Sequence, residues 1–130
     1  MAQEDKSLLL KDLCARSPYG VKGIITYDKS NTIFTVEGID NNVLHLSDAE
    51  ECYVEDFKPY LRPMSSMTSE ELLEYISLKE SIIAIDDITY FFETYESIDW
   101  LNSHHLDYRG LIEKGLALEA PEGMYNIKEK

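Results

Sequence analysis

The chain has 130 residues, which suits one domain and is too short for two ordinary ones. Its 44% of hydrophobic residues is enough for one core, so we expect a single domain over 1–130, with the ends, 1–6 and 125–130, as candidates for disorder. Twelve Lys and Arg against 25 Asp and Glu give a net charge of −13, which repels phosphate backbones and anionic lipid headgroups. We therefore expect no direct nucleic-acid partner and no membrane partner.

The N-terminal residues carry acids where an export signal needs positive charge, and the chain has no run of about eighteen apolar residues such as a membrane-spanning helix requires. The expected location is therefore cytoplasmic. The two cysteines, Cys14 and Cys52, are too few for a disulfide framework, so we expect both to be reduced and packed.

The first half of the chain is typical of one helix followed by a small sheet. Apolar residues at helical spacing predict a helix that begins after Ser7 and ends at the turn 18–20. Stretches rich in β-branched and apolar residues then predict four antiparallel strands. These strands are expected at about 21–27, 32–39, 43–46 and 52–57.

Two prolines in the middle of the chain, at 59 and 63, predict a rigid connector, because each removes a backbone donor and biases the residue before it toward extended conformations. The connector leads to a capping box, in which Thr68 caps a helix start and Glu71 reaches back to it. The helix is expected over 69–80. It is predicted to bury Leu72, Leu73 and Ile76.

Residues 81–93 fit either a pair of strands turning at Asp86-Asp87 or a continued helix, because periodicity does not separate short apolar runs. The strand pair is the favoured interpretation. Further on, Ser97 is expected to cap a short helix that runs to His105.

The last predicted element is a helix over 108–114, capped by Asp107 and ended by Gly115 in the left-handed conformation. Taken together, the elements predict an α+β fold. It consists of a small antiparallel sheet or open barrel (about 21–58) flanked by an N-terminal helix and a helical C-terminal half.

Three long segments, which together cover about half of the chain, carry a family resemblance. They are SLLLKDLCARSPYGVKG, VEDFKPYLRPMSSMTSEE and IDWLNSHHLDYRGLIEKGLALEAPEGMYN. In these segments the chain resembles a family of small uncharacterised proteins from Bacteroides-type gut bacteria and their phages or mobile elements. The resemblance implies a bacterial or phage cytosol. It brings no activity and no cofactor, so no residue role is carried over.

The most chemically suggestive cluster is His104, His105 and Asp107, since imidazoles and a carboxylate bind metals or move protons near neutral pH. The spacing argues against this role, because adjacent residues on a helix point about 100° apart, whereas metal-binding histidines are usually one turn apart. We expect His105 to pack in the helix stripe, His104 to lie over Trp100 and Asp107 to act as a cap.

Four residues are candidates for an interaction surface, because tyrosine and arginine dominate the energetics of protein interfaces. Tyr60 and Arg62 lie in the proline-bracketed connector, and Tyr108 and Arg109 follow Asp107. A structural role at the start of a helix is the alternative for the second pair.

Acidic residues gather in two runs, one over 70–99, where nine acids face one lysine, and one around residue 50. The second run consists of Asp48, Glu50, Glu51, Glu55 and Asp56. No phosphate-binding glycine loop, nucleophile elbow or zinc spacing is present in the sequence. The leading hypothesis is therefore a non-enzymatic interaction or accessory protein, which binds a protein partner or itself. The alternatives are an acidic nucleic-acid mimic that inhibits a basic protein, and a small enzyme or metal protein built on His104, His105 and Asp107.

Overall fold

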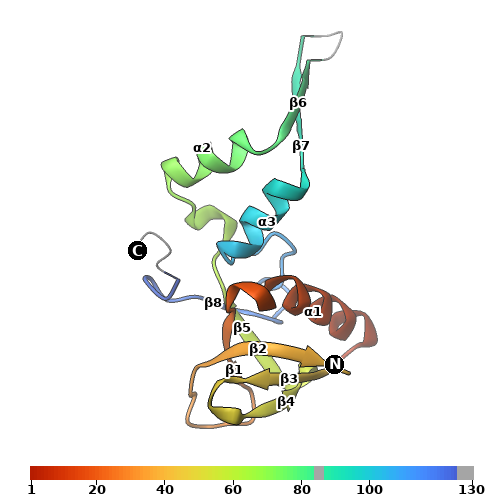
Figure 1. Cartoon of the computed structure of the whole chain (residues 1–130), viewed down its shortest axis with the longest axis vertical. Coiled ribbons are helices and arrows are strands. Elements are labelled where there is room, and N and C mark those ends of the chain that lie inside the picture. Colours follow the sequence, from red (N-terminus) through yellow and green to blue (C-terminus); the bar gives the residue numbers. More distant parts are fainter. Residues whose placement is uncertain (84–86, 126–130) are drawn as a thin grey trace.

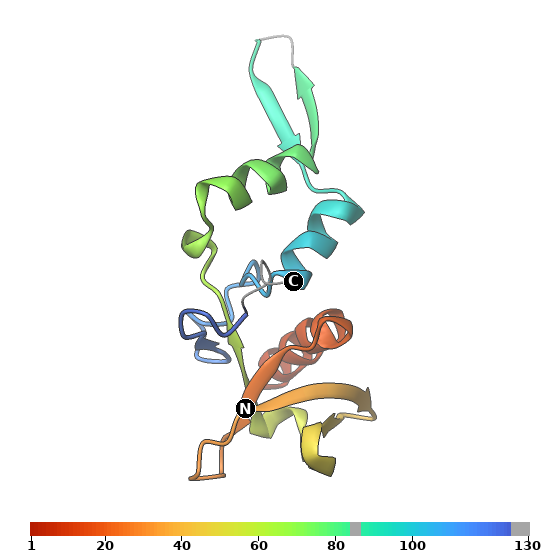
Figure 2. The same cartoon turned by 60° about the vertical axis from the view of Figure 1, so that its left-hand side comes forward.

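The chain forms an elongated α+β structure, with a sheet at one end, a pair of helices in the middle and a projecting hairpin at the other end (Figures 1 and 2). The computed structural model describes residues 1–83 and 87–125. Its helices are α1 (Gln3–Arg16), α2 (Ser69–Ser77) and α3 (Tyr95–Ser103). The predicted fold class is confirmed. The C-terminal half, however, combines helices with strands.

The main sheet has the strand order β4-β3-β2-β1-β5-β8. Its strands are β1 (Lys22–Ile25), β2 (Phe34–Asp40), β3 (Val43–Leu46), β4 (Glu51–Tyr53), β5 (Phe57–Leu61) and β8 (Leu118–Glu119). The pairs among β1 to β5 are antiparallel, whereas β8 runs parallel to β5. The described strands form an open sheet, with β4 and β8 at its edges and no closure into a barrel, so the first of the two predicted forms, a small sheet, is the one found.

Alternation along the strands separates the core from the solvent, as in β2, where Phe34 and Val36 are buried and Glu37 is exposed. Helix α1 contributes Leu9 and Leu13 to the same core. This helix begins at Gln3, five residues before the predicted start at residue 8, and so includes part of the 1–6 segment. Of the other predicted disordered segment, 125–130, the residues 126–130 lie outside the described residues.

The predicted fourth strand is in fact two strands separated by a 3₁₀ turn, η3 (Val54–Asp56). The predicted connector is also wrong in part, because Pro59 lies within β5, where it pairs with Gly23 of β1. A Cβ atom at Gly23 would lie 2.4 Å from the carbonyl oxygen of Lys58. The two strands therefore approach closely only because residue 23 is glycine.

Helix α2 begins with the predicted capping box, in which the Glu71 amide donates to Thr68 Oγ1 at 3.1 Å. It ends at Ser77, not at residue 80, because β6 (Glu80–Ile83) follows at once. The predicted buried stripe is wrong for Leu72 and Leu73, whereas Ile76 is partly buried against the cluster that contains Trp100. Leu72 and Leu73 are 43% and 69% exposed, and the buried residue is instead Tyr75, which stacks on Trp100 of α3 with ring centroids 5.6 Å apart.

The favoured strand pair is confirmed, since β6 pairs antiparallel with β7 (Thr89–Phe92). Of the predicted turn, Asp86 lies outside the described residues, while Asp87 has a φ of 63°. Helix α3 is capped by Thr94, and Ser97 is the third residue of the helix, which completes the capping box and is not the cap that we predicted. The helix ends at Ser103, before His105.

The predicted last helix over 108–114 is not present in the described residues, which form turns there. Asp107 does cap this segment, because its carboxylate accepts hydrogen bonds from the amides of Leu111 and Ile112 at 2.8 and 2.9 Å. Gly110 has a φ of 73°, which interrupts a right-handed helix after its first residues. Gly115 takes the predicted left-handed conformation, with a φ of 78°.

Candidate functional site

The hairpin of β6 and β7, here called the aromatic arm, projects beyond α2 and α3 at the end opposite the main sheet (Figures 1 and 2). Its second strand carries Tyr90, Phe91 and Phe92, which are 45%, 49% and 48% exposed. Successive side chains in a strand point to opposite faces, so Tyr90 and Phe92 lie on one face of the ribbon and Phe91 on the other. Both faces of the arm therefore present aromatic rings to solvent.

The base of the arm is held by Glu93, which directly follows β7. Its carboxylate accepts hydrogen bonds from the Tyr75 hydroxyl and, at 2.8 Å, from Ser97 Oγ, and it lies 3.5 Å from Lys79 Nζ. Burial disfavours the charged carboxylate, but the hydrogen bonds from Tyr75 and Ser97 and the charge of Lys79 together hold the pKa of Glu93 below its usual value. These contacts tie the arm to α2 and α3.

Other exposed apolar side chains lie on the helices next to the arm. Tyr95, at the start of α3, is 91% exposed, and Leu72 and Leu73 lie on the outer side of α2. Monomeric proteins rarely expose large side chains in such concentration, and exposed apolar surface of this kind marks interaction sites. The arm and the adjoining parts of α2 and α3 therefore expose apolar side chains of the kind found in binding surfaces.

Sequence reasoning did not identify the arm as a site. The run Thr89-Tyr90-Phe91-Phe92 lacks polar and apolar alternation, and such a run is normally typical of a strand buried on both faces. The one available signal was that acidic residues, Asp87 and Glu93, flank this aromatic run, which does not suit a strand buried on both faces. The exposure of the aromatic run follows from the tertiary arrangement, in which β6 and β7 form a separate two-stranded sheet.

The predicted interaction residues lie elsewhere, and the side-chain polar groups of Arg62, Tyr108 and Arg109 bind within the chain. The Arg62 guanidinium donates to both carboxylate oxygens of Glu71, at 3.0 and 2.7 Å. This side-chain hydrogen bond is the main reason why the pKa of Glu71 falls to about 2. Tyr60 is half-buried in β5, and its carbonyl accepts a hydrogen bond from the Tyr125 hydroxyl at 2.8 Å.

Tyr108 and Arg109 surround a fully buried ion pair that sequence reasoning missed. In α1, Arg16 Nε donates to Asp12 Oδ2 at 2.8 Å, and both side chains have no solvent exposure. Arg109 Nε donates to Asp12 Oδ1 at 3.2 Å, and the Tyr108 hydroxyl donates to Asn102 Oδ1 at 2.9 Å. Opposite charges four residues apart on the apolar stripe of α1 were the signal that could have revealed this pair.

The structure does not bring His104, His105 and Asp107 together into one site. His104 stacks on Trp100 with ring centroids 3.9 Å apart, as predicted. His105 lies beyond the helix end, stacks on Tyr125 and donates through Nε2 to the Tyr19 carbonyl at 3.1 Å. Its burial and the nearby Arg16 charge lower its pKa to about 3, so the ring is neutral. Among residues 1–83 and 87–125, no three His, Cys, Asp or Glu side chains are arranged to hold a metal.

The two acidic runs lie at opposite ends of the molecule (Figure 1). The run around residue 50 flanks β4 on the edge of the main sheet, where Glu55 lies 3.5 Å from Lys6 and Glu51 lies 3.0 Å from His45. The 70–99 run extends over α2, the arm and α3. The two runs therefore do not form one continuous acidic patch.

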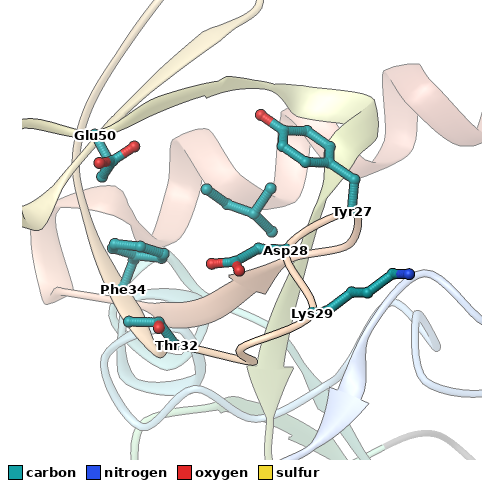
Figure 3. A pocket seen from close by; sticks show the side chains of 7 residues that line it. Tyr27, Asp28, Lys29, Thr32, Phe34 and Glu50 are labelled. Atoms are coloured by element: carbon teal, nitrogen blue, oxygen red, sulfur yellow. The ribbon is translucent and has the colours of Figure 1, made fainter.

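A shallow hollow of about 490 Å³ opens at the end of the main sheet (Figure 3). Its floor includes the core residue Phe34, and its rim carries Tyr27, Asp28 and Glu50, while Lys29 points away from the other side chains. The Asp28 carboxylate is already used within its own turn, where it accepts from the Ser30 amide at 3.0 Å. We assign no chemistry to this hollow.

Both cysteines are free, as predicted, but Cys14 is exposed and only Cys52 is packed. In the described part of the chain, no helix combines the length and the hydropathy that a membrane crossing requires. Comparisons with family models, curated proteins and solved structures find no match to this chain. The resemblance to the Bacteroides-type family therefore stays a prediction.

Proposed function

We propose that this protein is a non-enzymatic interaction protein, an accessory factor of a bacterium, phage or mobile element, which binds a partner protein through the aromatic arm. The observation that carries the proposal is the exposure of Tyr90, Phe91 and Phe92 on the two faces of a projecting hairpin. Aromatic residues are enriched in the cores of protein interfaces, where they supply large rigid contact areas.

The arm is also costly to maintain without a partner. An isolated two-stranded hairpin is at best marginally stable in water, because it buries neither of its faces. Its outer edges also leave backbone groups open to pairing with other chains. A binding role explains why such an element carries aromatic residues instead of the polar ones that would suit solvent.

The anchored base supports the same role. Because Glu93 binds Tyr75 and Ser97, the arm extends from α2 and α3 in a defined direction. An element that is ordered before binding loses less conformational entropy when it docks. The catalytic alternative has less support, because His105 is buried and neutral and His104 is stacked on Trp100.

The test is affinity capture from bacterial lysate at physiological salt with the full chain as bait. The arm variants are Phe91→Thr and Phe92→Thr, which keep a strand-forming residue. The matched control is Tyr53→Thr, which removes a 59% exposed aromatic ring from β4 at the far end of the molecule. We expect a stoichiometric partner that binds the wild type and Tyr53→Thr and is lost from both arm variants, with thermal stability unchanged.

Amide hydrogen exchange supplies a second measurement. Binding should slow exchange in β6 and β7 and leave β2 and β3 as they are in the free protein. If no stoichiometric partner is found, whether another protein or a second copy, or if the arm variants retain it fully, the proposed function is wrong.

A further inference from the structure

We infer that the partner of the aromatic arm is a different, basic protein, which receives the arm in an apolar cleft lined at its rim by lysine and arginine. This inference rests on the proposed function and names the chemistry of its partner. Its grounds are the placement of aromatic rings on the arm and the placement of charge around them.

The rings define the shape of the receiving surface. Tyr90 and Phe92 lie on one face of the ribbon and Phe91 on the other, and the three are exposed to almost the same extent. A flat surface would cover one face and leave the other in water. A cleft covers both faces of the ribbon, in the same way that the elements packed on either side of a buried strand cover both of its faces.

Carboxylates surround these rings. Glu80 pairs with Phe92 across the ribbon and therefore shares its face, and Asp87 lies two residues before the start of β7. Glu96 of α3 lies beside the base of the arm, and all three acids are exposed. A cleft that accepts the rings must therefore place its rim next to negative charge, which lysine and arginine complement.

The positive charge available within this region is small. Residues 70–99 contain nine acids and one lysine, a formal charge of −8. That lysine, Lys79, is already used, since its Nζ lies 3.5 Å from Glu93 and 5.0 Å from the centre of the Tyr75 ring.

The same charge argues against a second copy of this chain as the partner. Pairing two arms would bring two regions of charge −8 together, and like charges placed opposite each other destabilise paired strands. A basic partner, by contrast, would be steered toward the arm over a distance of about a Debye length, roughly 8 Å at physiological salt.

The experiment selects binding peptides from a random display library on the immobilised full chain, with counter-selection on Phe91→Thr. We expect enriched peptides that combine lysine or arginine with aromatic or aliphatic residues. Their affinity should fall as salt rises. It should also fall about tenfold when the arm charges are removed in the triple variant Glu80→Gln/Asp87→Asn/Glu96→Gln.

The control removes the same number of charges at the other end of the molecule, in Asp48→Asn/Glu50→Gln/Glu51→Gln, and should leave the peptide affinity unchanged. Arm-dependent peptides that are neutral or acidic, with affinity independent of salt, would overturn the basic partner and leave the proposed function standing. Peptides that bind Phe91→Thr as well as wild type would overturn the proposed function itself. Sedimentation analysis completes the test, because self-association abolished by Phe91→Thr would identify a second copy as the occupant.

Discussion

The buried ion pair of α1 permits a quantitative prediction for Asp12→Ala. The Asp12 carboxylate accepts hydrogen bonds from Arg16 Nε at 2.8 Å, Arg16 Nη2 at 3.2 Å and Arg109 Nε at 3.2 Å. Without it the Arg16 guanidinium keeps its bond to the Leu106 carbonyl, at 2.6 Å, but has lost its buried counterion. Removing one partner of a fully buried pair costs about 3–5 kcal/mol.

For a chain of this size, a loss of about 4 kcal/mol lowers the melting temperature by roughly 15 °C. The assay is urea unfolding at 25 °C, followed by circular dichroism, with the melting temperature as a second readout. Lys6→Ala is the matched control, because it removes a partly exposed ion pair with Glu55, and such pairs contribute at most about 1 kcal/mol.

A second variant separates charge from packing. Asp12→Leu/Arg16→Met replaces both charges by apolar side chains, and it should recover much of the stability that Asp12→Ala loses, since apolar replacement of a buried pair is often neutral. If Asp12→Ala costs no more than Lys6→Ala, the assignment of a structural role to this pair is wrong. The reasoning also fails if the double variant is less stable than the single one.

Three further predictions concern single groups. Glu71 has a folded-state pKa of about 2 against an ordinary value of 4.5, so its contribution is complete above about pH 4.5 and is lost as the pH falls toward 2. Urea unfolding should show about 2 kcal/mol of this loss in wild type and a flatter profile in Glu71→Gln. Gly23→Ala should lower the free energy of unfolding by about 2 kcal/mol or more, because the new Cβ conflicts sterically with β5. Gly38→Ala, with nothing within 4 Å of the new Cβ, should change it by less than about 0.5 kcal/mol. Equal effects of the two variants would contradict this expectation. A thiol reagent should modify the exposed Cys14 in the native protein and should reach the buried Cys52 only after unfolding. Burial, together with two nearby carboxylates, raises the pKa of Cys52 to about 12, which also keeps its thiol unreactive. Rapid native modification of both thiols would refute this assignment.

Local signals predicted local structure well. The capping box at Thr68 and Glu71, the pairing of β6 with β7 and the left-handed Gly115 are all found where the sequence indicates them. Each depends on hydrogen bonds or backbone preferences within a few residues. Such preferences act in the same way whatever the rest of the chain does.

Predictions of burial were less successful, because burial depends on what another element covers. Leu72 and Leu73 have the spacing of a core stripe, yet α2 meets α3 through Tyr75 and leaves both leucines exposed. Pro59 is predicted to lie in a rigid connector, yet it pairs within the sheet because Gly23 leaves room for β5. Three of the four predicted interaction residues, Arg62, Tyr108 and Arg109, have side-chain polar groups engaged inside the molecule, at Glu71, Asn102 and Asp12.

The amino-acid sequence by itself determined the fold class, the excess of negative charge and the capped start of α2. Only the tertiary structure decided that the aromatic strand over 89–92 projects into solvent and that Asp12 and Arg16 are fully buried. The physical reason is range. Backbone propensity and capping operate between neighbours along the chain, whereas exposure is set by which distant segments pack against a side chain, and no segment of the described structure covers either face of the arm.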